Sequence, residues 1–78
     1  MSRPTGPAEF EAYAADADLA AARFDEAAVD ADRAALTETD ARLRAGWQEL
    51  GTLHRQHAAD AREDASTYRD GRIPGDNS

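Results

Sequence analysis

The side chains best placed for chemistry are two histidines and two aspartates in the second half of the chain. His54, His57, Asp60 and Asp64 fall at i, i+3, i+6 and i+10, which places them on roughly one face of a helix. Imidazole and carboxylate groups at helical spacing can bind zinc or iron. The chain has no other histidine and neither a Glu-x-x-His nor a His-Glu-x-x-His motif. We therefore expect no metal site, and these four residues are its only candidate ligands.

The alternative interpretation of the two histidines is structural. On a helix that packs against another helix they would be partly buried contact residues. Their protonation below about pH 6.5 would then place charge between the helices and loosen the assembly. An assembly state that does not change between pH 5 and pH 8 would contradict this hypothesis.

No other pattern in the chain indicates catalysis or a cofactor. The sequence lacks a nucleophile elbow, a glycine-rich phosphate loop and paired catalytic carboxylates. Its net charge of −7 disfavours binding to nucleic acid or to anionic lipid, and the arginines interspersed among the acidic residues disfavour mimicry of DNA. No apolar run approaches the roughly 20 residues that span a bilayer, and the N-terminus has no apolar signal segment. We expect a cytoplasmic protein, or one exported without a cleavable signal peptide.

Composition indicates a protein that depends on association. The chain has 78 residues and no cysteine, and alanine supplies most of its apolar fraction. Alanine favours helix but buries little area, so a chain of this length is marginally stable alone and gains from oligomerisation or from a partner. All nine basic residues are arginine, and Ala, Asp and Gly are frequent, which is typical of a high-GC genome such as that of an actinobacterium.

The ends of the helical region are marked by proline and glycine. Pro7 suits the first position of a helix, and no proline follows until residue 74. Gly71 can take the left-handed conformation that ends a helix. The sequence predicts a flexible arm over residues 1–6, helix within 7–70 and a disordered tail over 71–78.

Apolar residues recur every seven positions in both halves of the helical region, as in a coiled coil. The stripe in the first half consists of Phe10, Ala17, Phe24 and Ala31 with Tyr13, Ala20, Ala27 and Ala34. The stripe in the second half consists of Trp47, His54, Ala61 and Tyr68 with Leu36, Leu43, Leu50 and His57.

These two stripes are out of phase by two residues, which on a straight helix is a rotation of about 200°. A single rod would bury opposite faces in its two halves. A chain reversal between residues 36 and 40 removes this conflict. The predicted fold is therefore all-α, an antiparallel two-helix hairpin with helices over 7–36 and 39–70, and the alternative is a single long helix.

The residues at the predicted reversal permit a new helix to start. Thr37-Glu38-Thr39-Asp40 resembles a capping box, with Thr37 or Thr39 as the capping residue. The two threonines could also be surface residues of a continuous helix, and Gly46 to Gly51 is a second candidate bend. A hairpin has only two layers, so we expect it to assemble into a four-helix bundle, as a dimer or on the helices of another protein.

Trp47, the only tryptophan, is the first candidate for an interface anchor, because tryptophan is enriched among residues that dominate binding. Arg44 is one turn earlier and could stack on its ring. We expect a non-catalytic adaptor, regulator or small subunit that self-associates or binds a helical partner; the alternative from another class is a metal-binding four-helix protein. The predicted interface residues are Phe10, Tyr13, Phe24, Leu36, Leu43, Trp47, Leu50 and Tyr68.

Length, acidity, the absence of cysteine, the hairpin pattern and Trp47 give the chain a resemblance to the WXG100 (ESX-like) proteins of type VII secretion. The resemblance implies a dimeric four-helix bundle, secreted folded, that acts as a secreted substrate or as its pairing partner. Two motifs of that family differ here. Trp47 is followed by Gln48 and Glu49 instead of reaching a glycine two residues later, and Tyr68 has Arg72, not an acidic residue, four positions on.

Overall fold

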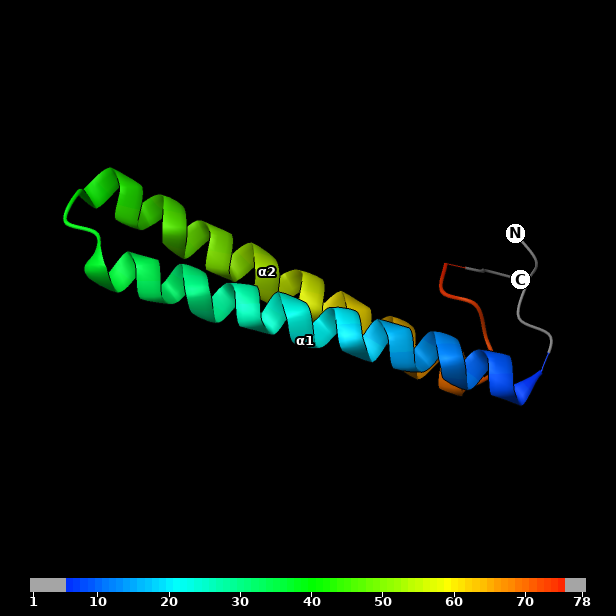
Figure 1. Cartoon of the computed structure of the whole chain (residues 1–78). Coiled ribbons are helices and arrows are strands. Elements are labelled where there is room, and N and C mark those ends of the chain that lie inside the picture. Colours follow the sequence, from blue (N-terminus) through cyan, green and yellow to red (C-terminus); the bar gives the residue numbers. More distant parts are fainter. Residues whose placement is uncertain (1–5, 76–78) are drawn as a thin grey trace.

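The computed structural model describes residues 6–75, which form two long antiparallel helices joined by a short turn (Figure 1). Helix α1 comprises Pro7–Thr37 and helix α2 comprises Ala41–Arg69. The described residues contain no strand. The predicted all-α hairpin is confirmed, and the alternative of one continuous helix is wrong. Most of the predicted arm and the end of the predicted tail, residues 1–5 and 76–78, lie outside the described residues.

The turn is built around Asp40, which caps α2. One carboxylate oxygen of Asp40 accepts hydrogen bonds from the backbone N–H groups of Arg42 (2.9 Å) and Leu43 (3.1 Å). The side chain of Glu38 accepts from the Asp40 N–H at 3.0 Å. The prediction that Thr37 or Thr39 caps this helix is therefore wrong. The carboxylate of Asp40 satisfies two amides at once and carries a full charge at the positive end of the helix dipole.

The other helix ends follow ordinary backbone rules. Pro7 occupies the start of α1, directly after the extended residue Gly6. The hydroxyl of Thr37 bonds back to carbonyl oxygens of the last turn of α1, so this residue closes the first helix. Gly71 ends α2 with φ of 77°, a conformation that favours glycine. The predicted second bend at Gly46 to Gly51 is absent, because α2 runs through both glycines.

The contact between the helices is lined by the smallest side chains of the chain. All buried apolar side chains of residues 6–75 are alanines, and the one other buried residue in this range is Gly51 of α2. A Cβ atom on Gly51 would lie 2.7 Å from the side-chain carboxylate of Asp32 and 3.7 Å from the backbone oxygen of Ala28 in α1. The buried alanines are Ala14, Ala21, Ala28, Ala31 and Ala35 of α1 and Ala58 and Ala65 of α2.

The centre of the contact therefore differs from the predicted stripes. The deepest series in α1 runs through Ala14, Ala21 and Ala28, four residues after Phe10 and its heptad relatives. The prediction placed the aromatic rings at the centre, but close approach of the two helices leaves room only for methyl groups there. The rings lie at the edge of the contact, where Phe10 and Phe24 are half-buried.

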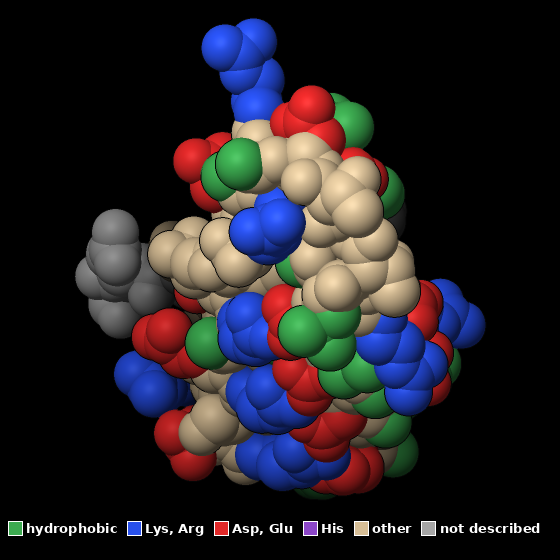
Figure 2. Space-filling view, turned by 90° about the vertical axis from the view of Figure 1, so that its left-hand side faces the viewer, with side chains coloured by type: hydrophobic (Ala, Val, Ile, Leu, Met, Phe, Trp, Pro, Cys, Tyr) green, Lys and Arg blue, Asp and Glu red, His purple; other side chains and the backbone are tan. Residues whose placement is uncertain are grey.

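One edge of the hairpin carries a series of ion pairs, which we call the ion-pair ladder. Arg55 pairs with Asp32, and Arg62 pairs with Asp25. Arg69 pairs with Asp18 at 2.8 Å and with Glu11 at 3.2 Å. All of these residues recur at intervals of seven along their helices, so the ladder follows one side of both. Figure 2, which views the molecule from the turn end, shows acidic and basic side chains interleaved.

Candidate protein-interaction face

The largest apolar side chains of α2 lie exposed on the half of the helix nearest the turn. Leu43 is 56% exposed, Trp47 39%, Leu50 36% and Leu53 46%. Their spacing of four, three and three residues keeps them on one side of the helix. We call these four residues the leucine–tryptophan face. The hairpin therefore buries alanine and exposes leucine and tryptophan, which reverses the usual distribution.

This face lies along the edge opposite the ion-pair ladder. At 100° per residue, the ladder positions and the positions of Leu43 and Leu50 fall on opposite sides of the buried alanine series. The same rule places Ala27 and Ala34 of α1 on the edge of the leucine–tryptophan face, and both are half-buried. One edge of the hairpin is thus neutralised by internal ion pairs, and the other offers apolar surface.

Aromatic contacts between the two helices lie further along the same edge, toward the end of the hairpin opposite the turn, which we call the open end. The ring of Phe24 stacks on His57 with centroids 5.2 Å apart and on His54 at 6.2 Å. Further along, Tyr13 of α1 stacks on Tyr68 of α2 at 5.4 Å. These contacts join the two helices beside the alanine core.

The four candidate metal ligands do not form a metal centre. Among residues 6–75, no group of three or more His, Asp or Glu side chains is arranged to hold a metal ion. His54 is half-buried, and its Nδ1 atom has no hydrogen-bond partner within the described part of the chain. His57, Asp60 and Asp64 are exposed. Both imidazoles act here as flat side chains packed against Phe24.

The structure divides the predicted interface residues among three places. Leu43, Trp47 and Leu50 lie together on the leucine–tryptophan face, with Phe24 beyond them on the same edge. Phe10, Tyr13 and Tyr68 lie near the open end. Leu36 is separate from both groups: it is 85% exposed and lines a hollow with Asp32 and Arg44 on the ladder side.

Arg44 does not stack on Trp47 as predicted. Its Nε atom donates to the carbonyl oxygen of Glu38 at 3.2 Å, which satisfies a carbonyl group at the end of α1. Arg44 thereby stabilises the turn, and the ring of Trp47 stays available at the surface.

Sequence reasoning missed Leu53 and the ion-pair ladder. Leu53 lies outside the two predicted stripes. It belongs to another helical series, Leu43, Gly46, Leu50 and Leu53, whose members are three, four and three residues apart. The signal for the ladder was a seven-residue series of acids in the first half and of arginines in the second. Those residues are Glu11, Asp18, Asp25 and Asp32, matched by Arg55, Arg62 and Arg69.

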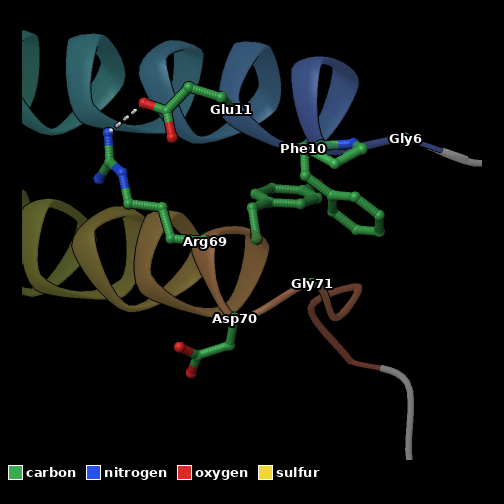
Figure 3. Close-up of a pocket in the computed structure, with 8 residues that line it drawn as sticks. Gly6, Phe10, Glu11, Arg69, Asp70 and Gly71 are labelled. Carbon is green, nitrogen blue, oxygen red and sulfur yellow. Dashed lines mark hydrogen bonds and ion pairs between the residues drawn. The ribbon is translucent and has the colours of Figure 1, made fainter.

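A hollow of about 480 Å³ opens at the end of the hairpin opposite the turn. Phe10 and Tyr68 form its apolar part, and Glu11 faces Arg69 across it, whereas Asp70 points away (Figure 3). The hydrogen bonds that Arg69 donates to the carboxylates of Asp18 and Glu11 raise the pKa of Arg69 above its ordinary value. The guanidinium is thus already engaged by two carboxylates of its own chain.

A second apolar stripe runs along the outward side of α1, away from α2. It includes Leu19, which is 52% exposed, and Val29, which is 47% exposed. Glu26 and Arg33 occupy positions within the same stripe and interrupt it with charge. This stripe is thus a poorer contact surface than the leucine–tryptophan face.

Comparison with known proteins finds no family model, no curated protein and no solved structure that matches this chain. Within residues 6–75, neither helix is long and apolar enough to cross a membrane.

Proposed function

We propose that the protein is a non-catalytic helix-packing module, an adaptor, regulator or small subunit, that self-associates or binds a helical partner through its leucine–tryptophan face. The observation that supports this most directly is the placement of Leu43, Trp47, Leu50 and Leu53 outside an all-alanine core. Exposed apolar residues in a contiguous row, flanked by polar groups, are typical of surfaces that bind protein.

The energetics of burial favour the same function. Full burial of a leucine-sized side chain contributes about 1.5–3 kcal/mol, and an alanine contributes much less. The hairpin therefore leaves a large part of its available apolar stabilisation unused. The four side chains of the face are still 36–56% exposed, so a partner that covers them would add about 3–5 kcal/mol, a large fraction of the total stability of a small domain.

The geometry suits a helical partner. Two antiparallel helices leave a groove along each edge, and further helices can pack into it to form a four-helix bundle. Ala27 and Ala34 at the edge of the face allow a helix to approach closely. Trp47, in the middle of the row, would be the anchor.

The test is size-exclusion chromatography with light scattering on the wild type and on Trp47→Ala, over a wide range of protein concentration. Leu19→Ala is a control, because Leu19 is similarly exposed but lies on the outward side of α1. We expect a concentration-dependent assembly and melting temperature that Trp47→Ala weakens and Leu19→Ala leaves unchanged. Equal effects of the two variants on association would contradict the proposed role of the face.

A second proposal is that the protein is a WXG100-like substrate of type VII secretion or the pairing partner of one. The antiparallel hairpin is the architecture that the resemblance implies. Trp47, however, lies within α2 and not in the turn, where that family carries its tryptophan. Detection of the protein in the culture medium of a host with an active type VII ATPase, and its loss when the ATPase is deleted, would support this proposal. Retention inside the cells of both strains would contradict it.

A further inference from the structure

We propose that the partner is a second copy of this chain, docked antiparallel on the turn-proximal half of α2 in one register. The two-fold axis would cross α2 at the level of residue 48, midway between Leu43 and Leu53 along the leucine–tryptophan face; the side chain of Gln48 itself lies on the ladder side. This inference rests on the proposed function, because it assigns both the occupant of that face and the geometry of its docking.

The outward side of α2 carries a second heptad stripe. Leu43, Gly46, Leu50 and Leu53 follow one another at intervals of three, four and three residues and form its turn-proximal half. The distal half continues at the same spacing with His57, Asp60, Asp64 and Thr67. The stripe is therefore apolar over its first half and polar and acidic over its second.

In the proposed register every apolar position meets an apolar position. Leu43 lies opposite Leu53 of the second copy, and Gly46 lies opposite its Leu50; the two-fold axis repeats both layers. A Cβ atom on Gly46 would meet nothing within 4 Å in the hairpin, so the surface there is open. The leucine of the second copy enters this open space, which lets the two helices approach closely.

Antiparallel registers with a longer overlap place carboxylates against leucine. Sliding the second copy by one heptad toward fuller overlap brings Asp60 opposite Leu43. Complete overlap brings Asp60 and Asp64 opposite Leu50 and Gly46. A parallel arrangement sets each aspartate against its own copy, which adds like-charge repulsion. Burial of an unpaired carboxylate is costly, so the short antiparallel overlap is the favoured arrangement of two copies.

Two residues next to the axis make this arrangement measurable. Trp47 comes beside Trp47 of the second copy, and it is the only tryptophan in the chain, so its fluorescence reports docking directly. On the other side of the contact, Glu49 of one copy faces Glu49 of the second copy. This like-charge pair opposes association, and Glu49→Gln is expected to lower the dissociation constant about two- to five-fold, in the range of exposed charge pairs.

The short overlap also predicts an elongated dimer whose open ends point away from each other. With the axis at Gln48, the two copies of Thr39 are separated by 18 residues along the helix direction, or about 27 Å at 1.5 Å per residue. The two copies of Ser66 are separated by about 54 Å on the same basis. In a fully overlapped antiparallel bundle, with the axis at Arg55, the order reverses to about 48 Å for Thr39 and 33 Å for Ser66.

The experiment measures these distances on the full chain by double electron–electron resonance. The chain contains no cysteine, so Thr39→Cys and Ser66→Cys each give one spin label per copy, at exposed positions. We expect the Thr39 distance to be clearly shorter than the Ser66 distance. The reverse order would overturn the register, although self-association through the face would stand.

A matched pair of variants separates failure of the register from failure of the proposed function. Leu53→Glu replaces a leucine that occurs twice in the contact and is expected to raise the dissociation constant at least about 100-fold. Leu19→Glu makes the same change on the outward side of α1 and should leave it unchanged, with circular dichroism confirming equal helix content. A dimer insensitive to Leu53→Glu would contradict both the register and the proposed use of the face. A chain monomeric at every concentration that binds another helical protein through Trp47 would overturn the self-docking proposal alone.

Discussion

Two glycines in the middle of α2 allow a matched test of how closely the helices approach. A glycine inside a helix costs about 1 kcal/mol relative to alanine, so substitution at either position gains the same helix propensity. Their surroundings differ: a Cβ atom on Gly46 would meet nothing within 4 Å, whereas one on Gly51 would lie 2.7 Å from a carboxylate oxygen of Asp32 and 3.4 Å from Arg55. Any difference between the two variants therefore reports the interhelical contact.

The expected magnitudes follow from this difference. Gly46→Ala should raise the free energy of unfolding of the hairpin by about 1 kcal/mol, which for a chain of this size is a shift in melting temperature of about 4–8 °C. Gly51→Ala must displace the carboxylate of Asp32 from Arg55. That exposed ion pair contributes about 0.2–1 kcal/mol, so its loss offsets between about one fifth and all of the gain from helix propensity.

The assay is urea denaturation followed by circular dichroism, with values extrapolated to low protein concentration. The extrapolation is needed because Gly46 faces Leu50 of the second copy in the proposed dimer, so Gly46→Ala should stabilise the hairpin but weaken association. Removing the obstruction with Asp32→Ala should restore the full gain of Gly51→Ala. If Gly51→Ala is as stabilising as Gly46→Ala in the otherwise unchanged chain, the close contact described at Gly51 is wrong.

Three further predictions concern the turn, the ladder and the aromatic contacts. Asp40→Ala removes both capping hydrogen bonds of α2 and should cost about 1 kcal/mol of unfolding free energy, whereas Thr39→Ala should change it little; equal losses in thermal melts would contradict the assignment of the cap. A double-mutant cycle of Asp25→Asn and Arg62→Gln should give a coupling energy of about 0.2–1 kcal/mol that decreases in 1 M salt, and a salt-independent coupling would exclude an exposed ion pair. Phe24→Leu should cost about 0.5–1.5 kcal/mol beyond the change in buried area, because it removes ring stacking; a loss explained by area alone in urea titrations would show that the stacking contributes nothing.

The hairpin could be predicted because periodicity and capping act locally. A shift of two residues between the stripes of the two halves cannot be accommodated on one straight helix, whatever the partner. The residues between 36 and 40 end one helix and start the next with their own side chains. In the structure the capping residue is Asp40 and not a threonine, and the chain reverses between residues 36 and 40, as the phase shift predicted.

The centre of the helix contact could not be predicted from apolar periodicity. Alanine occupies several heptad positions of α1, so it does not distinguish one face of the helix from another. The predicted stripe was therefore determined by the few large rings, Phe10 and Phe24. The rings are instead excluded from the centre, because the helices approach too closely for them. The series of charges gives the orientation directly, since Asp25 and Arg62 can pair only if both lie on the same edge.

In the proposed function the two edges of the hairpin have different roles, one in folding and the other in binding. The ion-pair ladder occupies one edge and neutralises charges within the chain, so that edge offers a second helix little to bind. The leucines and the tryptophan occupy the other edge, where each remains 36–56% exposed beside the alanine core. A chain that placed Leu50 and Trp47 between its own helices would be more stable alone but would lose the contact surface. Under the proposed function the all-alanine core and the exposed face belong together, because a partner that covers the face would add stability that the core does not supply.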